Sequence, residues 1–168
     1  MIKTATMKRN IFFLLFTVAT QLASAQLKGF SIGPYIEGAW PTGNFKKMNG
    51  TASGIGITAD INLPGKWSAT GSAGYLHFRR LNDPAHPELN SKAINALPLR
   101  AGVKYKLPIV YLKAEAGSAK LLNGDAAPFI FSPGAGVRLL GLDIQGNYET
   151  WVSDKSTNFW SLRLAYHF

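Results

Sequence analysis

The chain ends on the stretch FWSLRLAYHF, Phe159 to Phe168, in which apolar and polar side chains alternate. One parity carries Trp160, Leu162, Leu164, Tyr166 and Phe168, and the other carries Ser161, Arg163, Ala165 and His167. Successive side chains of a β-strand point to opposite faces, so the stretch predicts a strand with one apolar face. Terminal residues usually fray into water. A chain that ends on so apolar a strand is expected to bury it in a larger structure.

The first residues have the order of charge, apolar core and small side chains that is typical of a secretory signal. Lys3, Lys8 and Arg9 precede the apolar run 11–19, and Ala23-Ser24-Ala25 precedes Gln26. A run of this length is too short to cross a bilayer as a helix, which needs ~20 residues. We therefore predict a signal peptide at 1–25, cleaved after Ala25, and one domain at 26–168. Met1 and Met7 are both candidate start residues.

Charge and cysteine content narrow the classes of partner. The formal net charge is +9, and three of the cations lie in the predicted signal. An exported protein rarely meets nucleic acid, so we expect no nucleic-acid partner. We expect outer-membrane lipid or lipopolysaccharide to be the partner that balances the positive charge of the chain. The chain has no cysteine, so no disulfide stabilises it. No run approaches ~18 apolar residues, which predicts no membrane-spanning helix but allows a barrel of short strands.

Eight alternating segments separated by turn signals are predicted as strands. They are 29–40, 52–63, 67–78, 94–107, 110–119, 129–139, 142–151 and the terminal stretch 159–168. The connections between them alternate long and short, so the long ones share one end of the structure and the short ones the other. An even number of strands puts both termini at the short-turn end, which faces the periplasm in outer-membrane barrels.

Charged side chains follow one parity of these segments and aromatic side chains the other. The polar parity carries Glu37, Asp60, Arg100, Lys104, Lys106, Lys113, Glu115, Arg138, Asp143, Glu149 and Arg163. The apolar parity carries aromatic residues near the strand ends: Trp40, Trp67, Tyr75, Tyr105, Phe129, Tyr148, Trp160, Tyr166 and Phe168. A soluble sandwich would turn the apolar face inward, whereas a membrane barrel turns it to lipid. The aromatic positions, the balanced charges and the signal peptide favour a membrane barrel with a charge-paired lumen.

Three stretches carry a resemblance to a known family: GPYIEGAWPTGNF, LPLRAGVKYKL and the closing WSLRLAYHF. With them the chain resembles the outer-membrane β-barrel domain superfamily, the small eight-stranded porin-like proteins of Gram-negative bacteria. The resemblance implies an all-β, antiparallel, up-and-down transmembrane barrel in the outer membrane, with both termini periplasmic. It also implies that Leu164, Tyr166 and Phe168 form the signal that the barrel-assembly machinery reads. We expect a monomer, and the resemblance supplies no biochemical activity.

Residues that could carry chemistry are few. A lipid A-modifying barrel needs a nucleophile with a histidine base, and the candidates are His77, His86 and His167, none of which forms a His-x-Ser pair. Asp83, His86 and Glu88 could ligate a cation, but a Pro-rich loop with no second cluster is more typical of solvated polar residues. We therefore predict no catalytic, cofactor or metal site, and no enzyme.

The remaining candidate contacts are loop cations. Lys46, Lys47, Arg79 and Arg80 flank predicted strands and are candidates for contact with lipopolysaccharide phosphates. The sequence favours a structural, adhesive or envelope-integrity protein with a filled lumen. A narrow porin or small-ligand channel is the alternative, and a lipid A-modifying enzyme is the least favoured reading.

Overall fold

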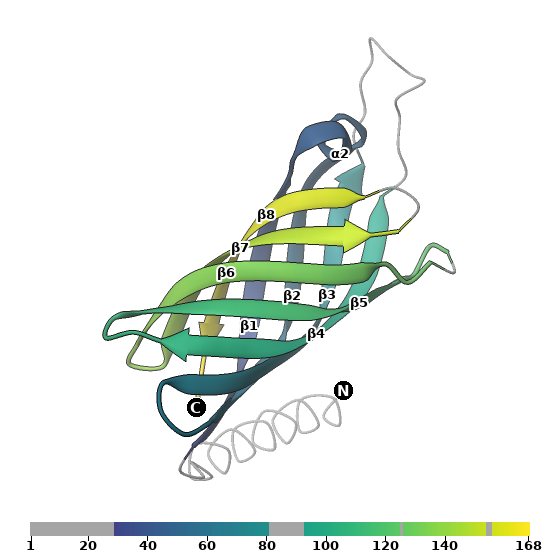
Figure 1. The fold of residues 1–168 in the computed structure, drawn as a ribbon. Coiled ribbons are helices and arrows are strands. Elements are labelled where there is room, and N and C mark those ends of the chain that lie inside the picture. The colour runs from purple at the N-terminus through teal and green to yellow at the C-terminus, as the bar shows by residue number, and fades with distance from the viewer. Residues whose placement is uncertain (1–28, 81–92, 125, 154–155) are drawn as a thin grey trace, which may run out of the picture.

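In a computed structural model the chain forms a closed antiparallel β-barrel of eight strands (Figure 1). The structure describes residues 29–80, 93–124, 126–153 and 156–168. Each strand pairs with its neighbours in sequence, and the last strand pairs with the first. This confirms the predicted all-β, eight-stranded, up-and-down fold. The predicted signal peptide, 1–25, lies outside the described residues.

The strands are 10 to 14 residues long. They are β1 Phe30–Pro41, β2 Asn49–Asn62, β3 Trp67–Arg80, β4 Ile94–Lys106, β5 Val110–Leu121, β6 Phe129–Leu139, β7 Leu142–Val152 and β8 Thr157–Tyr166. Every expected segment forms a strand, and the ends differ from expectation by three residues or fewer. Among the described residues, no helix has the length and apolar character to cross a membrane.

A short helix, α2 Gly43–Met48, lies in the connection between β1 and β2, which the sequence predicted as a loop. Six residues are too few to show a helical period, so the sequence pattern gave no signal for it. The helix is held by a tertiary contact instead: the ring of Phe45 packs edge-on against Phe78, with centroids 5.2 Å apart. Figure 1 shows α2 at one end of the barrel and the C-terminus at the other.

The short connections all lie at the end that holds the C-terminus (Figure 1). β6 and β7 are joined through Leu140 and Gly141, which both have positive φ angles, 51° and 85°. Two consecutive positive φ values match the twist of an antiparallel hairpin, and glycine adopts them without strain. The predicted alternation of long and short connections holds except between β7 and β8, where the connection 153–156 has four residues, as many as 63–66 between β2 and β3.

The strands are staggered around the barrel. Starting at Trp40 and following the register through β8, β7 and onward to β2, the path returns to β1 at Phe30, ten residues before its start. Rows of paired residues therefore climb around the wall, rising from β2 toward β5, because the strands tilt against the barrel axis.

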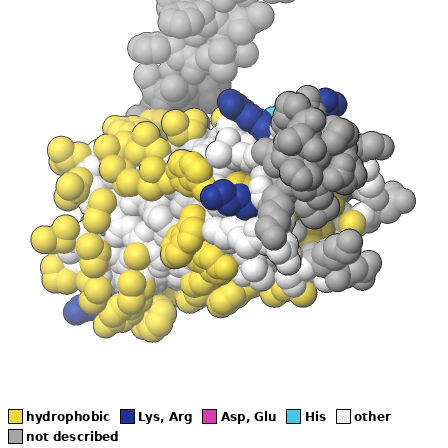
Figure 2. Space-filling model, turned by 90° about the horizontal axis from the view of Figure 1, so that it is seen from above, with side chains coloured by type: hydrophobic (Ala, Val, Ile, Leu, Met, Phe, Trp, Pro, Cys, Tyr) yellow, Lys and Arg dark blue, Asp and Glu magenta, His cyan; other side chains and the backbone are white. Residues whose placement is uncertain are grey.

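The outer wall is apolar and the interior is polar. Side chains such as Leu99 and Ile55 are 65% and 63% exposed on the outside, whereas Arg100 and Arg163 are 1% and 0% exposed. Aromatic pairs lie near both ends of the wall, with centroids 4.9 Å apart in Trp67–Tyr105 and in Tyr148–Trp160. In Figure 2, hydrophobic side chains gather along the left and lower sides of the wall. This distribution is the reverse of a soluble protein and matches a wall that faces lipid.

Candidate functional site

The lower part of the barrel interior, toward the short turns, is a network of charged side chains. It contains Glu37, Asp60, Arg100, Lys104, Lys113, Glu115, Arg138, Asp143, Glu149 and Arg163. Five carboxylates face five cations, and all but Arg138 are almost fully shielded from solvent. Ions removed from water are tolerated only when they are paired. The balance of signs therefore allows this many charges inside so narrow a barrel.

Glu37 and Arg163 stand opposite each other in the β1–β8 register. Both carboxylate oxygens of Glu37 accept hydrogen bonds from Arg163 Nη2 at 3.3 Å. Arg100 Nη2 donates to Glu149 Oε1 at 2.8 Å and lies 3.8 Å from Glu37 Oε2. The guanidinium of Arg163 also lies 4.4 Å from the centre of the Tyr35 ring. These contacts tie together β1, β4, β7 and β8 across the lumen.

Lys113 and Glu115 extend the network along β5. Their Nζ and Oε2 atoms are 2.9 Å apart, and Lys113 also donates a hydrogen bond to the Gln145 side chain of β7. Glu115 Oε2 lies 3.7 Å from Arg163 Nη1. Each cation therefore has more than one acceptor nearby, so the network is continuous rather than a set of isolated pairs.

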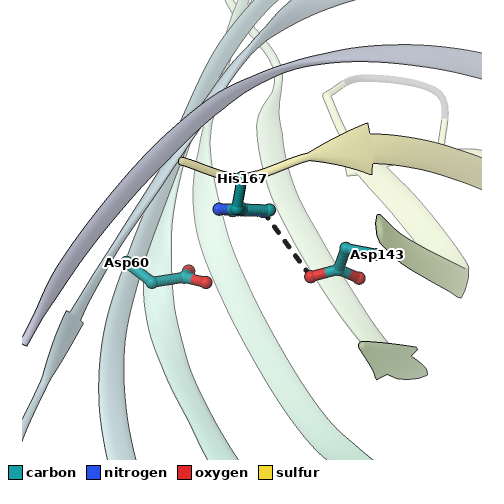
Figure 3. Close-up of side chains that lie close together, drawn as sticks. All are labelled: Asp60, Asp143 and His167. Carbon is teal, nitrogen blue, oxygen red and sulfur yellow. Dashed lines mark ion pairs between the residues drawn. The ribbon is translucent and has the colours of Figure 1, made fainter. Parts of the chain in front are cut away.

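Asp60, Asp143 and His167 meet at the short-turn end of the lumen (Figure 3). Each residue offers one possible metal-ligand atom, and these three atoms lie within 4.8 Å of one another, a spacing that suits a metal ion. The carboxylates, however, already share the guanidinium of Arg138, which bonds to both, and Lys104 Nζ lies 3.0 Å from Asp60 Oδ2. A divalent ion would have to displace one of these cations, so the cluster is better described as a four-membered ion network.

His167 lies one residue beyond the end of β8. Its Nε2 is 3.0 Å from Arg138 Nη2 and 3.6 Å from Asp143 Oδ2. Burial, reinforced by the charge of Arg138, lowers the pKa of His167 to about 4. The imidazole is therefore neutral at pH 7, where Nε2 accepts the hydrogen bond from Arg138.

The end of the lumen nearest α2 is filled differently, by an apolar plug. Its large side chains are Leu76, Phe78, Ile130, Trp151 and Phe159, packed among small alanines. The ring centroids of Phe78 and Phe159 are 5.3 Å apart, and those of Phe78 and Trp151 are 5.9 Å apart. Phe45 of α2 packs on the same cluster. Trp151 Nε1 donates to Glu149 Oε1 at 2.6 Å, so the plug joins the charge network.

The plug is the part of the interior that the sequence reasoning missed. Leu76 and Phe78 share the parity of Ser68, Thr70 and Ser72, whose buried polar side chains mark the lumen face of β3. Trp151 likewise shares the parity of Glu149, and Phe159 that of Arg163. Extending each polar parity to the end of its strand would have shown that the lumen turns apolar there. The expectation of a charge-paired lumen was therefore incomplete.

Glycines make room for the larger lumen side chains. A methyl group at Gly56 or Gly74 would collide with the phenol ring of Tyr35. At Gly102 it would collide with the backbone of Ala114 on the neighbouring strand. Replacement of these glycines is therefore limited by space rather than by backbone angle.

Of the two described candidate histidines, His167 lies beside a serine, with Nδ1 3.3 Å from Ser31 Oγ, but Arg138 bonds to both of these side chains. His77 faces outward and its Nδ1 lies 2.6 Å from Asn95 Oδ1. Ser72 faces the lumen, where its hydroxyl accepts from Arg163 Nη1 at 3.5 Å. Asp83, His86 and Glu88, the loop candidates for a cation, lie outside the described residues.

The other predicted positions lie on the surface. Lys46 is exposed on α2, and Arg79 and Arg80 are exposed at the end of β3; the side chain of Lys47 is not among those described. Leu164 and Tyr166 point outward from β8, 39% and 49% exposed. Phe168 continues the pairing past the end of β8, because its backbone N–H donates to the carbonyl of Ile32 at 2.9 Å.

Comparison with known proteins identifies the fold. No family model and no curated protein matches the chain. Among solved structures, the outer membrane protein Ail of Yersinia pestis in a phospholipid bilayer nanodisc is similar over 84% of this chain and 100% of Ail, with 16% identity and a TM-score of 0.61. Ail in complex with the heparin analogue sucrose octasulfate matches 83% of this chain and 97% of its own, with 18% identity and a TM-score of 0.53.

A designed protein has the same architecture. A de novo transmembrane β-barrel is similar over 85% of this chain and 98% of its own length, with 17% identity and a TM-score of 0.56. At such low identity, shared shape is the firm common property. The chain therefore has the closed eight-stranded fold of the small outer-membrane β-barrels.

Proposed function

We propose that the protein is a monomeric outer-membrane barrel with a structural, adhesive or envelope-integrity role, and that it conducts little or nothing. The observation that carries this proposal is the filled lumen. Ion pairs fill the part toward the short turns, and the apolar plug fills the part toward α2. Eight strands enclose a space only just wide enough for side chains. A hydrated ion path would have to break a buried ion pair and also wet an aromatic cluster.

Planar-bilayer conductance of the purified, refolded protein tests this proposal. We expect no channel events above the protein-free bilayer. Folding is verified on the same sample by its different migration in unheated and boiled SDS gels. Steady single-channel steps from the folded protein would support the narrow-porin alternative instead.

The surface charge supports contact with anionic glycolipid. Every carboxylate in the part of the chain that the structure describes is buried in the lumen, whereas Lys46, Arg79 and Arg80 are exposed. In the view from above, the charged side chains that show are Lys or Arg (Figure 2). Ail, which shares the fold, was solved with a sulfated heparin analogue. Exposed cations such as these suit polyanions of that kind.

We therefore propose lipopolysaccharide phosphates as partners of Lys46, Lys47, Arg79 and Arg80. Replacement of Arg79 and Arg80 by Ala should sensitise cells to detergents and polycations, measured against a strain with the wild-type chain at equal abundance. Unchanged permeability would contradict this contact.

Export and assembly complete the proposal. Residues 1–25 would direct secretion, and Leu164, Tyr166 and Phe168 would be read by the barrel-assembly machinery, leaving both termini in the periplasm. We propose no catalytic role, since His77 contacts Asn95, and since His167 and the neighbouring Ser31 are both bonded to Arg138 in the ion network. A deletion strain should therefore keep a wild-type lipid A profile, and a lost modification would indicate an enzyme.

A further inference from the structure

A group of polar side chains lies on the outer wall of the barrel, where β3, β4 and β5 approach the end that carries α2. Tyr75 Oη donates to Asn95 Oδ1 at 2.7 Å, and His77 Nδ1 lies 2.6 Å from the same oxygen. Asn95 Nδ2 donates to Asn123 Oδ1 at 3.2 Å, and Asn123 Nδ2 donates to the carbonyl of Ala93 at 3.0 Å. These bonds fix four polar side chains next to the apolar part of the wall.

The group marks the upper limit of the apolar wall on this side. Ile55 is paired with Tyr75, and the register between β3 and β4 puts Leu97 in the same row. Ile55 and Leu97 are 63% and 43% exposed. The next row toward α2 is Ser53, His77 and Asn95. The wall thus changes from apolar to polar in one step on three neighbouring strands. Such a change, with a tyrosine beside it, is expected where hydrocarbon gives way to lipid headgroups.

Two exposed cations flank this group. Arg79 follows His77 by two residues on the same face of β3, and Lys120 stands opposite Leu97 on β5. Because the rows climb from β2 toward β5, Lys120 lies higher in the wall than Tyr75 and approaches the level of Asn95. We call Tyr75, His77, Arg79, Asn95, Lys120 and Asn123 the wall patch.

The wall patch is one-sided and positively charged. Around the rest of the barrel, the outward positions near this end hold Trp40, Trp160 and Phe129, which are 49%, 56% and 54% exposed. Within the described ranges, no carboxylate lies on the outer surface to neutralise Arg79 or Lys120. The patch therefore presents cations and amide groups on the outer wall of the barrel.

We propose that the wall patch binds a phosphorylated glycolipid of the outer leaflet. Arg79 and Lys120 contact its phosphate oxygens, and Asn95 and His77 hydrogen-bond to phosphate or sugar oxygens between them. Guanidinium and ammonium groups form charge-assisted bonds with phosphate, and side-chain amides both donate and accept. The wall patch shares Arg79 with the lipopolysaccharide contacts proposed above and extends them along the barrel wall to Asn95 and Lys120. It therefore rests on the proposed function and on the proposed placement in the outer membrane.

The experiment uses the full mature chain in phosphatidylcholine nanodiscs that contain a small fraction of bisphosphorylated lipid A. Native mass spectrometry then counts the lipid A molecules retained by the barrel. Loss of both cations in R79A/K120A should weaken retention roughly tenfold, as expected for charge-assisted hydrogen bonds. Asn95→Ala should weaken it less. Lys66→Ala removes an exposed cation at the opposite end and is the matched control, expected to retain lipid A as the wild type does.

Several outcomes would overturn the site. Equal retention by R79A/K120A and the wild type would do so, as would an equal loss in Lys66→Ala. Equal retention of dephosphorylated lipid A, or of phosphatidylglycerol, would show that no phosphorylated glycolipid is recognised. Heat-modified migration confirms that each variant is folded. The conductance measurement is made on the same preparations. Channel events would contradict the proposed function but would not bear on the binding of lipid A by the wall patch.

Discussion

Arg163 and Leu164 are adjacent residues of β8 that face opposite solvents. Arg163 is buried against Glu37, and Leu164 is exposed on the outer wall. Whether a polar or an apolar side chain fits at either position therefore depends on whether that side of the strand faces the lumen or the lipid. Residue type alone does not show which side faces which.

Arg163→Leu should destabilise the barrel because Glu37 then keeps, as its ion pair, only the longer one with Arg100, 3.8 Å away. We expect a loss of about 3 kcal/mol in the free energy of unfolding, measured by urea titration in lipid vesicles. The double variant R163L/E37Q should recover about 1 kcal/mol or more of that loss, since no charge is then stranded. Additive losses would contradict a functioning Glu37–Arg163 pair.

Gly102→Ala should destabilise the barrel, because the added methyl group would collide with the Ala114 backbone. We expect a loss of about 1 to 3 kcal/mol in the same titration. Gly146→Ala is the control, because a methyl group there meets open space on the outer wall. Equal effects at the two positions would mean that β4 and β5 are not in the register described.

The elements were predictable because each strand carries a period of two, and the turn residues between them set the connections. α2 was not, since its six residues are held by the packing of Phe45 rather than by their own pattern. The side chains of the ion network share a parity, so the sequence could group them by face. It could not pair them, because partners such as Glu37 and Arg163 are 126 residues apart and meet only through barrel closure.

The apolar plug should contribute much of the stability of the strand ends near α2. Phe78→Ala removes a ring that contacts Phe45, Trp151 and Phe159, and we expect it to cost about 3 to 5 kcal/mol. Phe131→Ala, on the outer wall and 48% exposed, is the matched control and should cost clearly less. Chemical denaturation of both variants measures the difference. A larger loss of stability for Phe131→Ala would contradict the inference that the plug inside the lumen stabilises the strand ends near α2.

For the molecule as a whole, the outer face of the barrel wall is apolar because it meets lipid, and the inner face is polar because its charged side chains pair with one another. Leu164→Arg should cost about 2 to 4 kcal/mol near the membrane midplane, whereas Ser53→Arg, at the polar edge of the wall, should cost about 0 to 1 kcal/mol. Both are measured as free energies of unfolding in vesicles. If the two costs were equal, the wall would have no depth profile and the membrane assignment would fail.

The division of the lumen also determines how the interior can change. Toward the short turns, a substitution must be matched by a second one that removes the opposite charge, so sequence change there proceeds in pairs. In the plug, each aromatic ring can be shortened alone without leaving an ion unpaired. A pore is therefore most accessible, to an engineer or to evolution, from the end that carries α2, and it would widen inward until it meets Glu149 and Arg100.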